Sequence, residues 1–87
     1  MKNTVNLVHY TDWEGNEDWI LLGVYEKREN AMEALRKLIS NTQSFDIDDC
    51  SIADITPEER MVEHTYIDEE GDPCIDFTAQ ILEVEVQ

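Results

Sequence analysis

The sequence predicts a small α+β domain in which one principal helix packs on a mostly antiparallel sheet of about four strands. Three observations lead to this fold class. Runs with β-branched, aromatic and alternating apolar residues lie on both sides of a segment whose apolar residues recur at helical spacing. The chain has 87 residues, which is enough for one hydrophobic core and too few for two. We therefore expect residues 1–87 to form a single domain.

Two strands are expected before the helix. Residues 4–10, TVNLVHY, are rich in β-branched and aromatic types. Residues 19–26, WILLGVYE, form an apolar run that is too short for a free helix and has no evident solvent-facing positions. We expect this run to be a central strand that pairs antiparallel with the first. Gly23 within it indicates a β-bulge or a close approach by the following helix.

The principal helix is expected from about Lys27 to Ser40. Its apolar stripe consists of Ala31, Met32, Ala34, Leu35, Leu38 and Ile39. Acidic residues lie near its start and basic residues near its end, as the helix dipole favours. On its exposed face, Glu33 and Lys37 have the i,i+4 spacing of a favourable ion pair.

The segment between the helix and the last strands is mostly polar. A short strand is expected near residues 51–55. The motif TPEE, residues 56–59, has the order of a helix start, with threonine as N-cap, proline at the first helical position and glutamate closing a capping box. One or two helical turns are therefore expected there. The apolar residues expected to anchor the segment in the core are Phe45, Ile47 and Ile52.

Two further strands are predicted by MVEHTYID, residues 61–68, and by CIDFTAQ, residues 74–80. In the second, the apolar face begins on odd positions, with Ile75, Phe77, Ala79 and Ile81. It then moves to even positions, with Leu82, Val84 and Val86. We expect a β-bulge near Ile81 and Leu82 to absorb this shift. The bulge would keep Glu83 and Glu85 in water on the same side as Asp76 and Gln80.

The loop DEEGDP between these strands is predicted to be the turn of a β-hairpin, with Gly71 at positive φ and Pro73 at the strand entrance. It does not match a calcium loop of the EF-hand type, which needs glycine at position 6 and glutamate at position 12. A count from Asp68 gives proline and alanine at these positions, and a count from Asp46 gives serine and proline. Clustered carboxylates could still bind calcium loosely.

No motif predicts a metal site, a cofactor or a catalytic centre. Cys50, Cys74, His9 and His64 lack the close C-x-x-C or H-x-x-x-H pairs of zinc sites, and we expect both cysteines to be free thiols. The carboxylates of the turn should stay ionised in water, and no nucleophile or phosphate-binding loop accompanies them. We therefore expect a binding protein without enzymatic activity.

Charge is the strongest functional clue. Residues 1–37 carry seven acids and five bases, whereas residues 38–87 carry fourteen acids and one base, so that −13 of the net −15 lies in the second part. With only six basic residues in the chain, direct binding of nucleic acid is not expected. The acidity serves either solubility alone or contact with a basic partner protein. The candidate partner-binding residues are Asp46, Asp48, Asp49, Asp68, Glu69, Glu70, Asp72, Asp76 and Trp13.

Trp13 is included because it lies in the polar loop TDWEGNED and exposed tryptophans are favoured at binding hot spots. The alternative is that it folds back over the edge of the sheet. A monomer and a homodimer formed through an exposed strand edge are both compatible with the sequence.

Short length, strong acidity and the lack of a signal peptide or apolar spanning stretch make the chain resemble small acidic inhibitors of phages and mobile elements, including anti-CRISPR and anti-restriction proteins. The resemblance is one of size and charge. It implies a cytoplasmic protein, without cofactor or membrane contact, that imitates phosphates and occupies a nucleic-acid-binding protein. An acidic immunity protein that inhibits a basic toxin fits the same charges and is the alternative. The segment LLGVYEKRENAMEAL is also similar to small uncharacterised bacterial and phage domains in which a strand ending in GVY leads into a helix.

Overall fold

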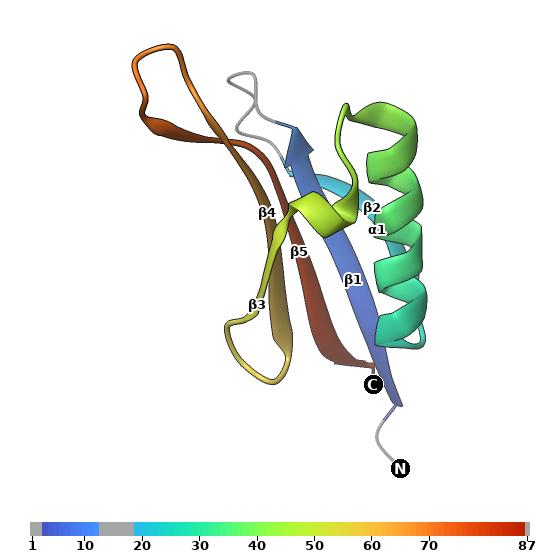
Figure 1. Ribbon diagram of the computed structural model, residues 1–87. Helices are drawn as coiled ribbons and strands as arrows, with labels where there is room; N and C mark the ends of the chain where they lie inside the picture. The colour runs from blue at the N-terminus through green and yellow to red at the C-terminus, as the bar shows by residue number, and fades with distance from the viewer. Residues whose placement is uncertain (1–2, 13–18, 87) are drawn as a thin grey trace.

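A computed structural model describes residues 3–12 and 19–86 and shows one helix packed against an antiparallel sheet (Figure 1). The α+β class is confirmed, but the sheet has five strands and not the expected four. In chain order the elements are β1 (Asn3–Asp12), β2 (Ile20–Tyr25), α1 (Arg28–Thr42), the short 3₁₀ helix η1 (Ile47–Asp49), β3 (Ser51–Asp54), β4 (Glu59–Ile67) and β5 (Pro73–Val86). Neither helix of the described residues is both long and apolar enough to cross a lipid bilayer.

The strand order across the sheet is β2-β1-β5-β4-β3, and every neighbouring pair is antiparallel. β1 and β5 form the centre and pair without interruption from Asn3 opposite Val86 to Asp12 opposite Phe77. β2 pairs with β1 as expected, but it lies at an edge, so its predicted central position is wrong. An all-apolar run suggests burial on both faces, yet Leu21 and Val24 of this run are about half exposed.

A β-bulge interrupts the pairing of β2 with β1, as Gly23 predicted. Val8 lies opposite Gly23 and His9 lies opposite Leu21, so Leu22 is the extra residue. A Cβ atom added at Gly23 would lie 2.7 Å from the hydroxyl oxygen of Tyr25. The close approach therefore comes from the same strand and not from α1.

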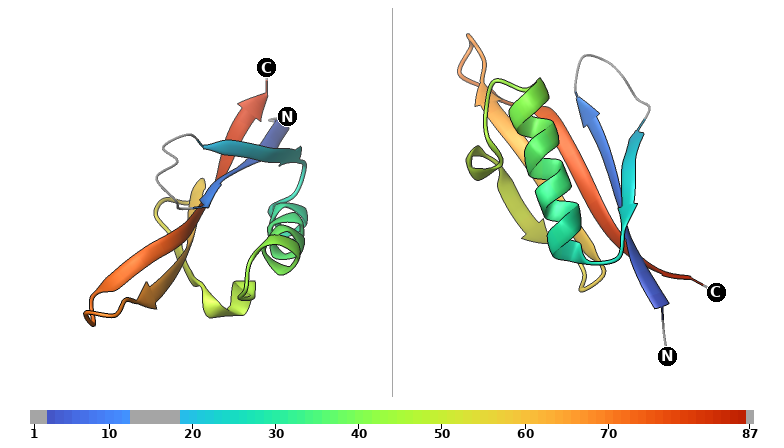
Figure 2. Two further views of the ribbon diagram at one scale, coloured as in Figure 1. Left: turned by 90° about the horizontal axis from the view of Figure 1, so that it is seen from above. Right: turned by 90° about the vertical axis from the view of Figure 1, so that its right-hand side faces the viewer.

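Helix α1 lies on one face of the sheet (Figure 2) and supplies the stripe that the sequence predicts. Its ends are within two residues of the expected bounds. On the exposed side, Glu33 pairs with Arg36 at 3.6 Å in place of the expected Lys37. The fully buried core consists of Val8, Ala31, Leu35, Ile39, Ile47, Val62, Phe77, Ala79 and Ile81.

The segment after α1 follows the sequence expectations in part. Ile47 is buried and Phe45 packs against the core, but Ile52, on the edge strand β3, is 47% exposed. The short strand β3 lies where a strand was expected. The helix predicted from TPEE is absent, because residues 55–58 form the turn between β3 and β4 and Glu59 begins β4. Thr56 Oγ1 accepts backbone N–H groups from Glu58 and Glu59, at 3.3 and 3.1 Å, so the capping side chain stabilises a turn instead of a helix.

The β-bulge expected near Ile81 and Leu82 is not there, since both residues pair in continuous register with β1 and with β4. The irregularity in this hairpin lies between His64 and Thr65, whose partners are Phe77 and Ile75, so that Asp76 is the extra residue. Ile75, before the bulge, is consequently 44% exposed and not part of the core face.

Without a bulge at residue 81, alternation continues to the end of β5. Phe77, Ala79 and Ile81 face α1, and the even positions that follow face away from it. Leu82, Val84 and Val86 therefore lie on the opposite face of the sheet from the core. Glu83 and Glu85 share the face of Ile81. The expectation that they lie on the same side of the sheet as Gln80 is therefore wrong.

Candidate partner-binding surface

The densest group of candidate carboxylates lies in the turn between β4 and β5. The hairpin is confirmed: the Gly71 N–H donates to the carbonyl of Asp68 at 3.0 Å, the Asp68 N–H donates to the carbonyl of Asp72 at 3.0 Å, and Gly71 has φ of 86°. Figure 1 shows the end of this hairpin projecting beyond the other strands of the sheet. The turn is thus both exposed and fixed in shape by its own backbone bonds.

Asp68 is the residue that holds the turn together. Its Oδ1 accepts the backbone N–H groups of Asp72 and Glu70, each at 2.9 Å, and the Cys74 thiol lies 3.5 Å from its Oδ2. Several hydrogen bonds lower the pKa of Asp68 below its usual value, and the one from the Asp72 backbone N–H has the largest effect. Asp68 is therefore occupied within the turn, whereas Glu69, Glu70 and Asp72 are exposed.

A second group of carboxylates surrounds η1. The Asp46 N–H donates to Oδ2 of Asp49 at 2.9 Å, and the Asp46 side chain accepts the Asp49 N–H in return, which forms a capping box. Asp48 points into solvent with its side chain 85% exposed, and its Oδ1 lies 3.9 Å from Arg36 Nη1. Of this group, Asp48 is the carboxylate most available to a partner.

Asp76 differs from the carboxylates of the turn and of η1 because it pairs with a histidine on the neighbouring strand. The bulge turns Asp76 toward β4, where its Oδ1 lies 2.6 Å from Nδ1 of His64. The His64 ring stacks on Phe45 with centroids 3.6 Å apart and an interplanar angle of 4°. Phe45 also meets Phe77 edge-on, with centroids 6.0 Å apart. This stack attaches the segment before η1 to the β4–β5 hairpin.

Cys50 follows η1 and is a free thiol, as is Cys74. Burial raises the pKa of Cys50 to about 11, and the negative charges of Asp49 and Asp76 act in the same direction. A thiol with this pKa is almost entirely protonated at neutral pH and is a weak nucleophile. In residues 3–12 and 19–86, no three histidine, cysteine or acidic side chains converge as metal ligands would.

The single basic residue of the acidic part is already paired. Arg60 Nε donates to Oδ1 of Asp54 at 2.7 Å and its Nη2 donates to Oδ2 at 3.3 Å. This hydrogen bonding lowers the pKa of the exposed Asp54 and raises that of Arg60. Arg60 therefore neutralises one neighbour and leaves the carboxylates of the turn and of η1 without compensation from this part of the chain.

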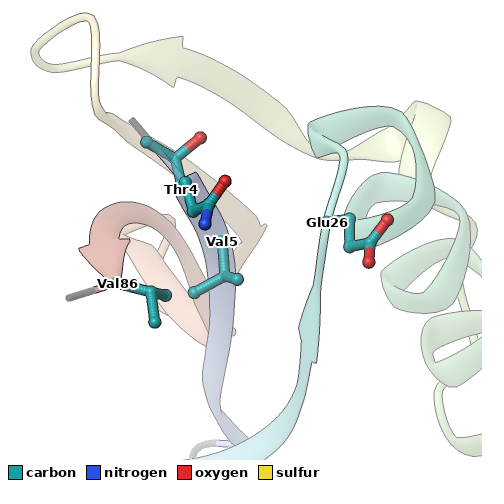
Figure 3. A pocket seen from close by; sticks show the side chains of 5 residues that line it. Thr4, Val5, Glu26 and Val86 are labelled. Atoms are coloured by element: carbon teal, nitrogen blue, oxygen red, sulfur yellow. The ribbon is translucent and has the colours of Figure 1, made fainter. Parts of the chain in front are cut away.

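Among the hollows lined by described residues, two lie at opposite ends of the sheet. One is at the end of β1 and β5 farthest from the hairpin and is lined by Asn3, Thr4, Val5, Glu26 and Val86 (Figure 3). The other is mainly apolar, lies beside the acidic turn and is lined by Tyr66, Pro73, Cys74 and Ile75. Only the second neighbours the candidate carboxylates, and the sequence offered no signal for it beyond a tyrosine and an isoleucine near the turn.

The structure thus divides the candidate residues by role. Glu69, Glu70 and Asp72 are exposed together on the hairpin, Asp48 is exposed at η1, and the other described members are held in local hydrogen bonds, namely Asp46, Asp49, Asp68 and Asp76. The hairpin turn and η1 are at separate places (Figure 1). Trp13 lies outside the described residues. No family model, curated protein or solved structure matches this chain.

Proposed function

We propose that the protein is a cytoplasmic inhibitor that binds the basic, nucleic-acid-binding surface of another protein and occupies it in place of phosphates. The observation that carries the proposal is the charge of residues 38–87, which contain fourteen acids and one base. That base, Arg60, is already paired with Asp54 at 2.7 Å. Lysine and arginine side chains that bind phosphates also accept spaced carboxylates, with hydrogen bonds strengthened by charge.

The hairpin is the part of the molecule best suited to this contact. Glu69, Glu70 and Asp72 are exposed on a turn whose shape is fixed by the bonds of Asp68, so little conformational entropy is lost on binding. The apolar hollow at Tyr66 and its neighbours lies beside these carboxylates and offers a site for an apolar or aromatic side chain of the partner. Charge and a local anchor are thus combined at one projecting end.

The test is capture of proteins from a host lysate at low and high salt, followed by binding measurements with each retained protein. Affinity should fall steeply between about 50 and 200 mM salt, because screening weakens contacts between exposed charges. Nucleic acid should compete for the same partner. Capture of one cognate toxin, and of no nucleic-acid enzyme, would instead favour the immunity-protein alternative.

A matched pair of variants separates the turn from general acidity. Glu69→Gln, Glu70→Gln and Asp72→Asn together should slow association with the partner. Glu26→Gln, Glu29→Gln and Glu33→Gln remove the same charge from the β2–α1 connection and the first half of α1, and they should have a smaller effect. All six side chains are exposed, so both variants should fold. If the turn variant binds every retained protein as fast as the parent, the proposal fails for this turn.

A further inference from the structure

The face of the sheet opposite α1 is apolar where a solvated sheet face is normally polar. Strand alternation and register place on it Val5, Leu7, Leu21, Val24, Met61, Leu82, Val84 and Val86, which we call the open face. None of these side chains belongs to the buried core or packs against it. Among the described residues, no helix or strand covers this face (Figure 2).

The open face is continuous across three strands. Leu7 on β1 lies opposite both Val24 on β2 and Leu82 on β5, and Val5 lies opposite Val84. Strand spacings of about 4.8 Å and rises of about 3.3 Å per residue give a patch roughly 10 Å wide and 20 Å long. Leu21, Val24 and Val86 on this patch are about half exposed, and its other side chains are partly exposed. A contiguous apolar patch that solvent reaches marks an interaction site on a folded protein.

Polar and acidic residues lie at two edges of the open face. His9 and Gln80 lie opposite each other in its last row toward the β1–β2 loop, between Leu21 on β2 and Met61 on β4. On the β4 side, Glu59 lies opposite Leu82, and Glu63 lies on the same face four residues further along the strand, opposite Thr78. The charged residues that the register places on this side of the sheet are therefore acidic, and they lie along one flank of the apolar patch.

These observations decide between two kinds of occupant. A second copy of this chain would bring another −15 of charge and another pair of these glutamates against the same face. A helix with one apolar stripe and lysine or arginine on a flank would instead match both the patch and its acidic side. A length of about 20 Å corresponds to roughly 13 residues of helix, close to the 15 residues of α1 on the other face.

We infer that the open face is the docking surface for an amphipathic, basic helix of the partner protein. The apolar stripe of that helix would pack on Leu7, Leu82 and their neighbours, and its basic flank would lie over Glu59 and Glu63. The sheet would then carry a helix on each face, which is a stable layered arrangement. The inference rests on the proposed function, because it takes the partner to be basic, and it adds a contact that salt does not screen.

The experiment uses two labelled synthetic peptides of identical leucine and lysine composition. In one peptide the leucines have helical spacing and form a single stripe, and in the other the order is scrambled. Fluorescence anisotropy with the full chain should show at least about tenfold tighter binding of the amphipathic peptide. At high salt the affinity for the scrambled peptide should fall more than that for the amphipathic one.

Two triple variants locate the binding surface. Leu21→Thr, Val24→Thr and Val86→Thr remove methyl groups from the open face at side chains that are 53%, 52% and 48% exposed, so the fold should persist. Ile20→Thr, Ile52→Thr and Ile55→Thr are the control, because these residues are also exposed but lie outside the open face. Only the first variant should lose the preference for the amphipathic peptide, and thermal melts should show that both variants are folded.

The outcomes separate this inference from the proposed function. Salt-sensitive and equal binding of both peptides by the parent would overturn the inference and leave the basic-partner proposal standing. Binding of neither peptide would contradict both. A preference that survives in the first variant, or a concentration-dependent dimer that this variant abolishes, would also overturn the inference, since the second result assigns the open face to another copy of the chain.

Discussion

His64 Nδ1 lies 2.6 Å from Asp76 Oδ1, across two neighbouring strands and next to the β-bulge that brings the carboxylate into place. The same imidazole stacks on Phe45, so its removal deletes a hydrogen bond and an aromatic contact at once. His64→Ala should lower the free energy of unfolding by about 1–3 kcal/mol. Urea denaturation followed by circular dichroism measures this change.

His9→Ala is the matched control for that variant. His9 lies on the other face of the sheet, opposite Leu21 and Gln80, and away from the core. Its replacement should change stability by less than about 0.5 kcal/mol, as is usual for substitutions away from buried networks. If both variants lose the same free energy of unfolding, the hydrogen bond to Asp76 and the stacking on Phe45 do not stabilise the fold.

Acid should weaken the turn between β4 and β5. The Asp72 N–H, with further N–H donors, lowers the pKa of Asp68 in the folded protein below the usual 3.8. The contribution of Asp68 to stability is therefore complete above the unfolded pKa and is lost as the pH falls through the folded pKa. An NMR titration should give a carboxyl midpoint for Asp68 below 3.8, and Asp68→Asn should abolish this part of the acid dependence of stability. A midpoint at or above that of an unstructured peptide would contradict the role assigned to Asp68.

Cys50 should react slowly with thiol reagents in the folded protein. Its pKa is raised from 9.0 to about 11, so its thiolate fraction at neutral pH should be about a hundredfold below that of the denatured chain. In a Cys74→Ser background, the alkylation rate should rise with pH up to about 11 and should increase sharply on denaturation. Equal rates for the folded and the denatured chain would refute the burial of this thiol.

Gly71 should tolerate substitution only at a cost in stability. Its φ is +86°, and a Cβ atom there would have no neighbour within 4 Å, so backbone strain is the sole expected penalty. Gly71→Ala should therefore lower the free energy of unfolding by about 1 kcal/mol, and Gly71→Asn should lower it less. Urea titrations of both variants test this order. A neutral Gly71→Ala would mean that the turn relaxes to negative φ.

The helix, the first strand and the hairpin at DEEGDP could be predicted because each depends on local pattern: the stripe from Ala31 to Ile39, the β-branched run before Tyr10, and a glycine at a turn. The helix predicted at TPEE was wrong for a related reason. A threonine that caps backbone N–H groups serves a tight turn as well as a helix, and the local sequence does not distinguish them.

Register could not be predicted in the same way. The change from odd to even apolar positions at Leu82 fits either a bulge or a second apolar face, and only the pairing of Leu82 with Leu7 decides for the second. The same limit applies to the candidate site. Exposure of Glu69 and Glu70 followed from the turn, whereas the contact of Asp76 with His64 depends on a bulge that long-range pairing fixes.

The central pairing of β1 with β5 also determines when the chain can fold. Bringing Asn3 opposite Val86 closes a loop of nearly the whole described chain, with an entropic cost of roughly 4 kcal/mol before any contact repays it. Such topologies fold in milliseconds to seconds. On a ribosome that adds about 5–20 residues per second, β1 must wait several seconds for the roughly sixty residues that precede β5. Throughout that interval the edge of β1 that pairs with β5 stays open, although β2 is already available for the other edge, so synthesis is the stage at which the chain most needs protection from aggregation.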